Sequence, residues 1–265
     1  MGALGPESTT RVAGHSWPRP PAALFLDRDD VHVWRVRLDA PLDVVTDLVA
    51  LLSDEEKAKL GQGLGGEAGR HFVESHGALR RILSWYLNSR PEQLCFVADA
   101  RGKPYLASPA GPPAIHFNLS HSGALALCAV TRGRDVGVDV ERIRPVSAWR
   151  EIAARYFSRR EFEVLCAWPD DRALEAFFWG WTRKEAYSKA LGQGVSRRWT
   201  QFSVPLTAGV VTELPDARLE AEGEGRFTLC PLAPGPGYVA AVTARGTGWH
   251  LRCWQWDWAK RSERE

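Results

Sequence analysis

One helix constrains this chain more than any other feature, because the stripe that it would bury begins apolar and ends charged. The apolar positions, at helical spacing, are Leu174, Phe177, Phe178 and Trp181. One turn further, the same stripe reaches Lys184, Glu185 and Ser188. Lys189 follows four residues after Glu185, on the same side of the helix. Burying a charge is unfavourable unless another group pairs with it, so this helix end either reaches water or meets a ligand.

Length and charge narrow the class of protein. A chain of 265 residues suffices for one large domain or two small ones. The net charge of +2 does not favour a nucleic-acid partner. Five cysteines without a CxxC pair are typical of reduced thiols in a cytoplasmic protein. No apolar run approaches the roughly 18 residues of a membrane span, and the N-terminus lacks a secretory pattern, so no membrane partner is expected.

Hydrophobic periodicity predicts a mixed α+β protein. Strands are expected at 31–38, 135–141, 202–204, 238–244 and 251–258, and the stretch 114–131 reads as strand, polar loop, strand. Helices are expected at 41–52, 53–60, 71–87 and 145–157, with a capping box at Ser158 and Glu161 opening another. Each half offers helices and strands. We therefore expect a disordered tail over 1–22 and two α+β halves, 23–134 and 135–257, the second holding the metal site described below.

The strand "VGVDVE" at 136–141 carries a pair of acids. Side chains alternate between the faces of a strand, so Asp139 and Glu141 point the same way, with Cβ atoms roughly 6–7 Å apart. Both could reach one cation, while the valines between them face a core. The alternative is a half-buried strand whose outer face is acidic, and for this strand alone it is the stronger interpretation.

Glu185 would supply a third carboxylate to that pair. Oxygen-rich sites of this kind suit Mg²⁺, which completes its octahedron with water and substrate phosphate. The alternative is an ion pair between Glu185 and Lys189 on a solvated face. The position of Glu185 on the buried stripe argues against solvation.

Two short motifs offer groups for phosphate oxygens. The stretch "FNLSHS" places donors in a predicted loop between two strands, namely Asn118, Ser120, His121 and Ser122. In "RGKPYL", a turn holds Lys103 between a glycine and a proline, which would fix its charge for a phosphate. Each motif alone is equally compatible with an ordinary polar turn.

Taken in order, GKP, FNLSHS, GVDVE and W-x-x-KEA-x-x-K resemble the motifs of the Sfp-type phosphopantetheinyl transferases, over about residues 31–204. The resemblance implies a pseudodimer of two similar α+β halves with coenzyme A in the cleft between them. It also implies transfer of 4′-phosphopantetheine from coenzyme A to a serine of an acyl or peptidyl carrier protein, leaving adenosine 3′,5′-bisphosphate. Members of this single-chain type are usually monomers.

The resemblance also implies roles for residues of the second half. The Mg²⁺ carboxylates would be Asp139, Glu141 and Glu185. Glu185 is in addition a candidate base for the serine proton, with a metal-bound water as the alternative. Lys189 would lie near the pyrophosphate with Lys184 as its companion in the motif.

In the first half, the resemblance implies contacts with the coenzyme A phosphates. Ser120 and His121 match the family's phosphate-contacting pair, Lys103 its basic loop residue and, more loosely, Lys59 a lysine for the adenosine phosphates. His76 stands where the family usually has an arginine for the 3′-phosphate. Coenzyme A binding is therefore expected to be weaker or pH-dependent, unless Arg80, one turn on, substitutes.

Three other questions stay open at this level. The segment 142–168, rich in arginine, is the expected docking surface for an acidic carrier protein, although these arginines could simply solvate helices. A magnesium-dependent nuclease would use similar acids but should show a larger basic stripe. A binding module without catalysis would lack one of the metal carboxylates. The carrier served and the choice of Mg²⁺ over Mn²⁺ are undetermined.

Overall fold

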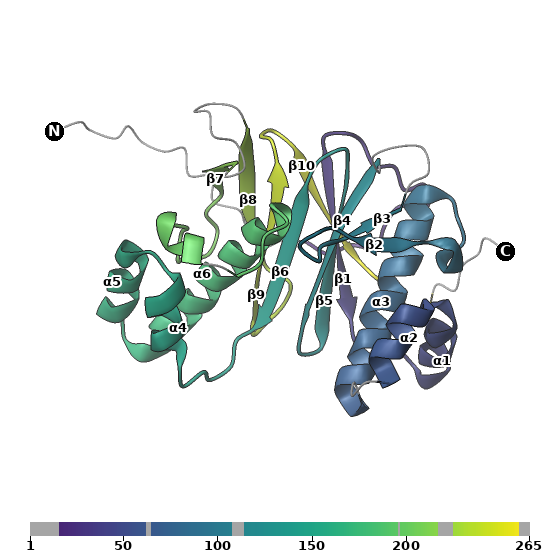
Figure 1. The fold of residues 1–265 in the computed structure, drawn as a ribbon, viewed down its shortest axis with the longest axis horizontal. Coiled ribbons are helices and arrows are strands. Elements are labelled where there is room, and N and C mark those ends of the chain that lie inside the picture. Colours follow the sequence, from purple (N-terminus) through teal and green to yellow (C-terminus); the bar gives the residue numbers. More distant parts are fainter. Residues whose placement is uncertain (1–15, 62–64, 108–113, 196, 217–224, 260–265) are drawn as a thin grey trace.

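Two four-stranded sheets, each with one long helix against it, stand side by side along a seam (Figure 1). The computed structural model describes residues 16–61, 65–107, 114–195, 197–216 and 225–259. Its helices are α1 Leu42–Leu51, α2 Asp54–Gly61, α3 Gly66–Leu87, α4 Trp149–Tyr156, α5 Arg159–Ala167 and α6 Asp170–Ala190. Short 3-10 helices span Pro91–Gln93 (η1) and Arg197–Gln201 (η2).

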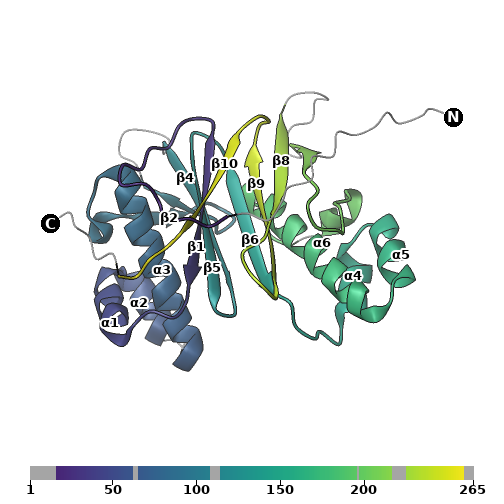
Figure 2. The ribbon, with the colours of Figure 1, turned by 180° about the vertical axis from the view of Figure 1, so that it is seen from behind.

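The strands form two sheets and one hairpin. They are β1 Asp30–Arg37, β2 Phe96–Ala98, β3 Pro104–Leu106, β4 Ile115–Ser122, β5 Leu125–Arg132, β6 Val136–Arg142, β7 Thr212–Pro215, β8 Arg226–Leu232, β9 Tyr238–Arg245 and β10 His250–Gln255. The first sheet has the order β10-β1-β5-β4 and the second β6-β9-β8-β7. The last strand, β10, pairs in parallel with β1 and so returns the chain to the first sheet, as the view from behind shows (Figure 2).

The seam is joined by an apolar core and by polar contacts. Alternate residues of β1 serve different cores: Val33 packs at the seam with Val138 of β6, whereas Trp34 packs under α3. At the edges, side chains of β4 bond to the backbone of β6. The Asn118 Oδ1 accepts from the Val138 N–H at 2.8 Å, and the Ser122 Oγ accepts from the Arg142 N–H at 3.1 Å.

The predicted α+β class is confirmed, and two sheets with one long helix each agree with the expected pair of halves. The predicted capping box at α5 is present, with both the Ser158 and Glu161 bonds made. The predicted N-cap Ser53 also accepts from the Glu56 N–H, at 3.2 Å. No helix of the described residues combines the length and the apolar content that crossing a membrane requires.

Two local predictions were wrong. The expected polar loop over 118–122 is the second half of β4, because Asn118 and Ser122 bond to the backbone of β6 and the strand continues its pairing with β5. The expected strand at 202–204 is irregular, because its backbone groups are used by buried side chains. The Phe202 carbonyl accepts from Lys184, and the Val204 N–H donates to Glu161.

The tail expected over 1–22 falls mostly on residues 1–15, which lie outside the described part of the chain. Within 16–22, two residues contact the second half of the chain. The Trp17 Nε1–H donates to the Ala233 carbonyl at 2.8 Å, and the Pro18 carbonyl accepts from the Gln255 N–H at 2.8 Å.

Candidate active site

A glycine allows α6 to lie directly on β6. A Cβ atom at Gly137 would stand 2.1 Å from the Ala186 carbonyl oxygen and 2.4 Å from the Ala190 nitrogen. Any side chain at Gly137 would therefore push the helix backbone away from the strand. This close approach brings the last turns of α6, with Glu185 and Lys189, over the acids of β6.

Lys189 and Asp139 form the centre of the site. The Lys189 ammonium lies 2.7 Å from the Asp139 Oδ1 and donates to the Ser120 Oγ at 3.0 Å. The Ser120 hydroxyl donates to the same Asp139 oxygen at 2.8 Å. The other oxygen, Oδ2, is buried and has no hydrogen-bond partner among the residues that the structure describes. Since a buried polar atom without a partner is unfavourable, this oxygen is prepared for a cation or a donor.

Glu141 lies near the C-terminal end of β6. Its Oε2 accepts from the Ser122 hydroxyl at 2.7 Å. Burial raises the pKa of Glu141, and the neighbouring Asp139 raises it further. Ser122 thus connects β4 to the second carboxylate as Ser120 connects it to the first.

Glu185 has the most perturbed carboxyl group of the site. Burial raises its pKa to about 7, with the charge of Asp139 adding to the shift and that of Lys189 opposing it. Within the described residues Glu185 makes no ion pair, because Lys189 is engaged with Asp139 instead. Glu185 would therefore change its protonation state near neutral pH, as a general base should.

Asp139 lies close enough to Glu141 and Glu185 for its charge to raise the pKa values of both. Among the described residues, no three His, Cys, Asp or Glu side chains are gathered as a metal site. Their chemistry nevertheless fits a hard cation, since the unpartnered Asp139 oxygen is buried beside two further carboxylates with raised pKa values.

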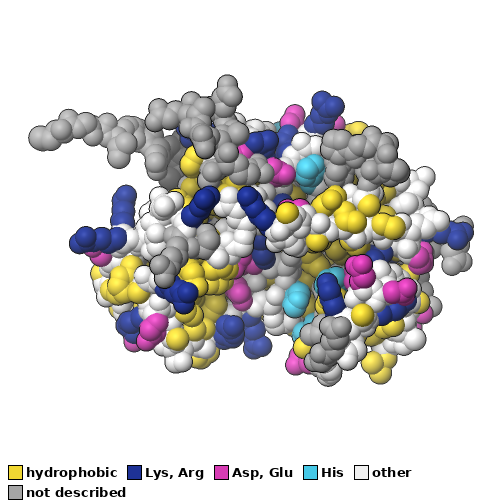
Figure 3. Space-filling model, viewed as in Figure 1, with side chains coloured by type: hydrophobic (Ala, Val, Ile, Leu, Met, Phe, Trp, Pro, Cys, Tyr) yellow, Lys and Arg dark blue, Asp and Glu magenta, His cyan; other side chains and the backbone are white. Residues whose placement is uncertain are grey.

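Histidines line the first half's side of the hollow between the halves (Figure 3). His76 stacks on the Phe72 ring, 3.8 Å between centroids, and its Nδ1 lies 3.0 Å from the Phe72 carbonyl oxygen. A carbonyl only accepts, so Nδ1 carries the proton and Nε2 is bare in the neutral ring. Burial lowers the pKa of His76 to about 4. Neutral His76 can therefore not donate to a phosphate through Nε2.

Two other predicted phosphate residues lie close to His76. His121, on β4, has an exposed side chain. Partial desolvation of its ring nevertheless lowers its pKa, and the charges of His71 and Lys189 lower it further. Lys59, on the last turn of α2, is exposed, and its charge lowers the pKa of His76. The histidine His71 was not selected from the sequence, since a lone histidine on a helix carries no signal of its own.

Lys103 connects the β2–β3 hairpin to α6. Its ammonium donates to the carbonyls of Val136 and Ala190, at 3.2 and 3.3 Å. The backbone N–H of Lys103 donates to Asp99 Oδ1 at 2.9 Å, which fixes the turn. Lys103 thus lies where β6 begins and α6 ends, separated along the strand from Glu141.

The structure does not place the side chains of Lys184 and Arg80 beside the carboxylates of the candidate site. The Lys184 ammonium is fully buried, 2.9 Å from Glu161, and donates to the carbonyls of Trp199 and Phe202 at 2.8 Å. Arg80 is likewise buried, with its guanidinium on Glu56 and on backbone carbonyls. Both cations are engaged inside the protein, which gives each a structural role.

The segment 142–168 contributes α4 and α5 at the side of the second half. Hydrophobic and basic side chains are mixed over these two helices in Figure 3. Arg150 pairs with Asp170, and Arg159 pairs with Glu163 at 2.9 Å. Its role as a docking surface stays a prediction.

Comparisons with known proteins show what this chain is similar to. The model of the 4′-phosphopantetheinyl transferase superfamily matches residues 135–243. The 4′-phosphopantetheinyl transferase HetI of Nostoc sp. (strain PCC 7120) is 38% identical over 243 residues, which cover 91% of this chain and 99% of HetI. The 4′-phosphopantetheinyl transferase Sfp of Bacillus subtilis (strain 168) is 30% identical over 216 residues, 80% of this chain and 91% of Sfp.

Proposed function

Since this chain belongs to the 4′-phosphopantetheinyl transferase superfamily and has that enzyme activity, we propose that it uses coenzyme A and Mg²⁺ to modify a serine of an acyl or peptidyl carrier protein. The products would be the holo carrier protein and adenosine 3′,5′-bisphosphate. The observation that carries the proposal is the convergence of Glu185 and Lys189 of α6 on Asp139 of β6.

In the proposed reaction, Glu185 accepts the proton of the carrier serine. Without metal, burial raises its pKa to about 7, so its carboxylate is a stronger base than that of an exposed glutamate. The serine oxygen then forms a bond to the β-phosphorus of coenzyme A. The bond from that phosphorus to the bridging oxygen breaks, and adenosine 3′,5′-bisphosphate leaves with the electron pair.

Asp139, Glu141 and Glu185 are the residues that would hold Mg²⁺. When bound, Mg²⁺ neutralises the negative charge that develops on the pyrophosphate. Lys189 adds a positive charge from the protein, because its ammonium already lies between Asp139 and Ser120. Ser120 holds the Asp139 carboxylate in place through its hydroxyl.

The phosphates of coenzyme A would lie along the first half. His121 and Lys59 are exposed there, close enough to affect the half-buried His76 electrostatically. Lys103 would face the same ligand from the hairpin. An acidic carrier protein would dock on α4 and α5, where basic and hydrophobic side chains are mixed. We place the reaction in the cytoplasm, carried out by a monomer.

Intact-mass spectrometry of an apo carrier protein tests the reaction. The carrier is incubated with this protein, coenzyme A and Mg²⁺, and compared with samples lacking the metal or containing Glu185→Gln. Glu175→Gln is the matched control, because Glu175 is exposed on the same helix. A gain of one phosphopantetheine mass, lost without metal and in Glu185→Gln only, is expected.

Failure to modify any of several carriers, despite coenzyme A binding, would contradict the proposal and favour a binding module without catalysis. Full activity of Glu185→Gln would instead retain the reaction and remove Glu185 as the base. Release of nucleotides from nucleic acid in place of carrier modification would favour a nuclease.

A further inference from the structure

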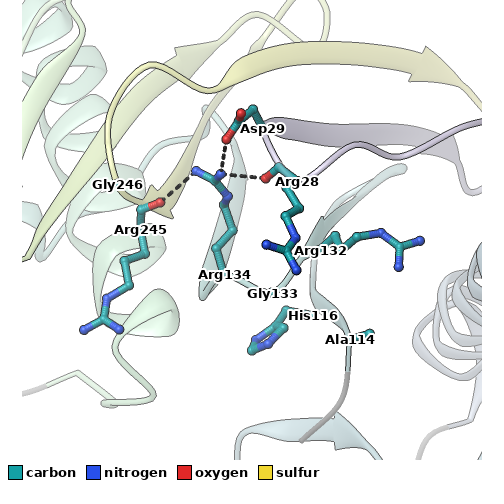
Figure 4. Close-up of a pocket in the computed structure, with 9 residues that line it drawn as sticks. All are labelled: Arg28, Asp29, Ala114, His116, Arg132, Gly133, Arg134, Arg245 and Gly246. Carbon is teal, nitrogen blue, oxygen red and sulfur yellow. Dashed lines mark hydrogen bonds and ion pairs between the residues drawn. The ribbon is translucent and has the colours of Figure 1, made fainter.

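A basic cavity lies at the end of the seam opposite to Glu141 (Figure 4). Its volume is about 790 Å³, within the usual range of about 300–1,000 Å³ for small-molecule sites. Both halves contribute turns to its wall: residues 28–29 before β1, 114–116 at the start of β4, 132–134 between β5 and β6, and 245–246 after β9. Along β4, His116 is about 16 Å from His121, from the rise per residue of a strand. The cavity is thus distinct from the carboxylate site.

Arg134 builds the cavity rather than occupying it. Its guanidinium donates to the Asp29 carboxylate at 2.7 Å and to the carbonyls of Arg28 and Arg245, at 2.5 and 3.1 Å. These bonds join the segment 28–29 and the end of β9 to one side chain. Arg134 therefore neutralises Asp29, the acid among the lining residues. Asp29 does not pair with the other arginines of the cavity wall.

Two guanidinium groups of the cavity wall, those of Arg28 and Arg132, can still bind an anionic ligand. Arg28 is exposed, and within the described part of the chain its side chain has no hydrogen bond or ion pair. In Figure 4 it extends into the middle of the group, above His116, while Arg132 extends to one side. Arg132 uses only its Nε, which donates to the Leu26 carbonyl at 3.2 Å. Arg245 differs, since it pairs with Asp216 at 2.6 Å.

This pattern selects a ligand with more than one phosphate group. Guanidinium binds phosphate through two parallel hydrogen bonds, so each free arginine can hold one phosphate. Arg28 comes from the turn before β1 and Arg132 from the end of β5, and a second phosphate would let one ligand meet both. We propose that the cavity binds a small molecule with a diphosphate group, either inorganic pyrophosphate or a nucleoside diphosphate. This inference does not depend on the proposed transferase reaction.

Isothermal titration calorimetry with the full chain tests the proposal. Pyrophosphate and ADP are titrated separately into the wild type, Arg28→Gln and Arg28→Gln/Arg132→Gln. Arg90→Gln, just before η1, is the matched control, because Arg90 is also exposed and has no side-chain partner among the described residues. We expect at least a tenfold rise in Kd in the double variant, which is about 1.4 kcal/mol, a smaller rise in Arg28→Gln and no change in the control.

The KM for coenzyme A is measured on the same variants, and thermal melting verifies their folding. The expected result is an unchanged KM beside the weakened diphosphate binding. Tighter binding of ADP than of pyrophosphate would identify a nucleotide as the ligand, and equal binding an inorganic one. No binding to the wild type, or equal binding to all variants, would overturn the proposal. A KM that rises in step with Kd would also overturn it, by making the cavity part of the coenzyme A site.

Discussion

The two long helices, α3 and α6, occupy similar places against the two sheets but use their charges differently. On α3, the buried charges are matched within the first half: Arg80 pairs with Glu56 at 2.7 Å, and Glu74 accepts from the Ala40 N–H at 2.9 Å. On α6, Lys184 is matched in the same way by Glu161, but Glu185 and Lys189 face the seam. The two helices thus differ over their last turns, where α6 carries the candidate catalytic groups.

Glycine placement explains why α6 and not α3 reaches its strand. Gly77 on α3 allows close approach of the Leu48 side chain, 2.7 Å from the position of a Cβ. Gly137 lies on the strand β6 and admits the backbone of α6 itself. The comparison teaches that the active site depends on helix–strand contact in the second half, whereas the first half uses the same device for helix–helix packing.

Substitution of the two lysines of α6 gives the sharpest test of the comparison. Lys189→Met should lower turnover by about 100-fold or more, because it removes a charge placed for the pyrophosphate. Lys184→Met should keep its turnover per folded molecule, because the Lys184 ammonium is buried against Glu161. The rate of carrier modification, normalised to folded protein, measures both. Equal losses would break the distinction and return Lys184 to the phosphate site.

The buried ion pairs of the two helices should behave alike. Arg80→Met and Lys184→Met each leave a buried carboxylate without its partner, which should lower the free energy of unfolding by about 3–5 kcal/mol. Urea denaturation followed by tryptophan fluorescence gives these values. A variant that loses less than about 1 kcal/mol, the range of a surface pair, would show that its carboxylate finds another partner.

Substitution of the two glycines should destabilise the protein to different extents in the two halves. Gly137→Ala should lower the free energy of unfolding by about 3 kcal/mol, because the new methyl group meets helix backbone that cannot move alone. Gly77→Ala should lose about 1 kcal/mol or less, because the Leu48 side chain can rotate and alanine favours the helix. Chemical denaturation of both variants measures the difference. Equal losses would show that α6 is not held more closely than α3.

His76 tests whether α3 takes part in binding. His76→Arg should lower the KM for coenzyme A by about tenfold at pH 8, the value of one well-placed charged hydrogen bond. The wild-type ring is neutral there, since its pKa lies at about 4. Steady-state kinetics at several coenzyme A concentrations measure the change. An unaltered KM would leave α3 as a purely structural helix.

The smallest expected effect is the pH dependence of stability without metal. The folded pKa of Glu185, about 7, lies above the ordinary 4.5, so folding binds its proton more tightly. This stability is present near pH 4.5 and is lost as pH rises through 7. After allowance for partial solvation the loss is about 1–2 kcal/mol. Thermal melts from pH 5 to 8 should slope downward, and less so in Glu185→Gln. Identical slopes would contradict the assignment.

Local patterns predicted much of this molecule, and long-range contacts account for what they could not. The periodicity of α6 correctly placed Lys184 on a buried face, but its partner Glu161 is 23 residues away in sequence and no local rule selects it. The sequence of the polar stretch of β4 predicts a loop, because no local pattern indicates that Asn118 bonds to the backbone of a second strand. The alternation of β6 placed its acids together correctly on one face, and the approach of α6 required the structure.

The parallel pairing of β10 with β1 has a consequence for how the protein is made. During synthesis, β1 leaves the ribosome more than 200 residues before its neighbour, since residues 30–37 and 250–255 lie near opposite ends of the chain. Until then one edge of β1 has no strand to pair with, and an open edge invites association with other chains. The first half is therefore completed only after the strands of the second half have been translated, so the nascent chain must protect that edge until β10 emerges.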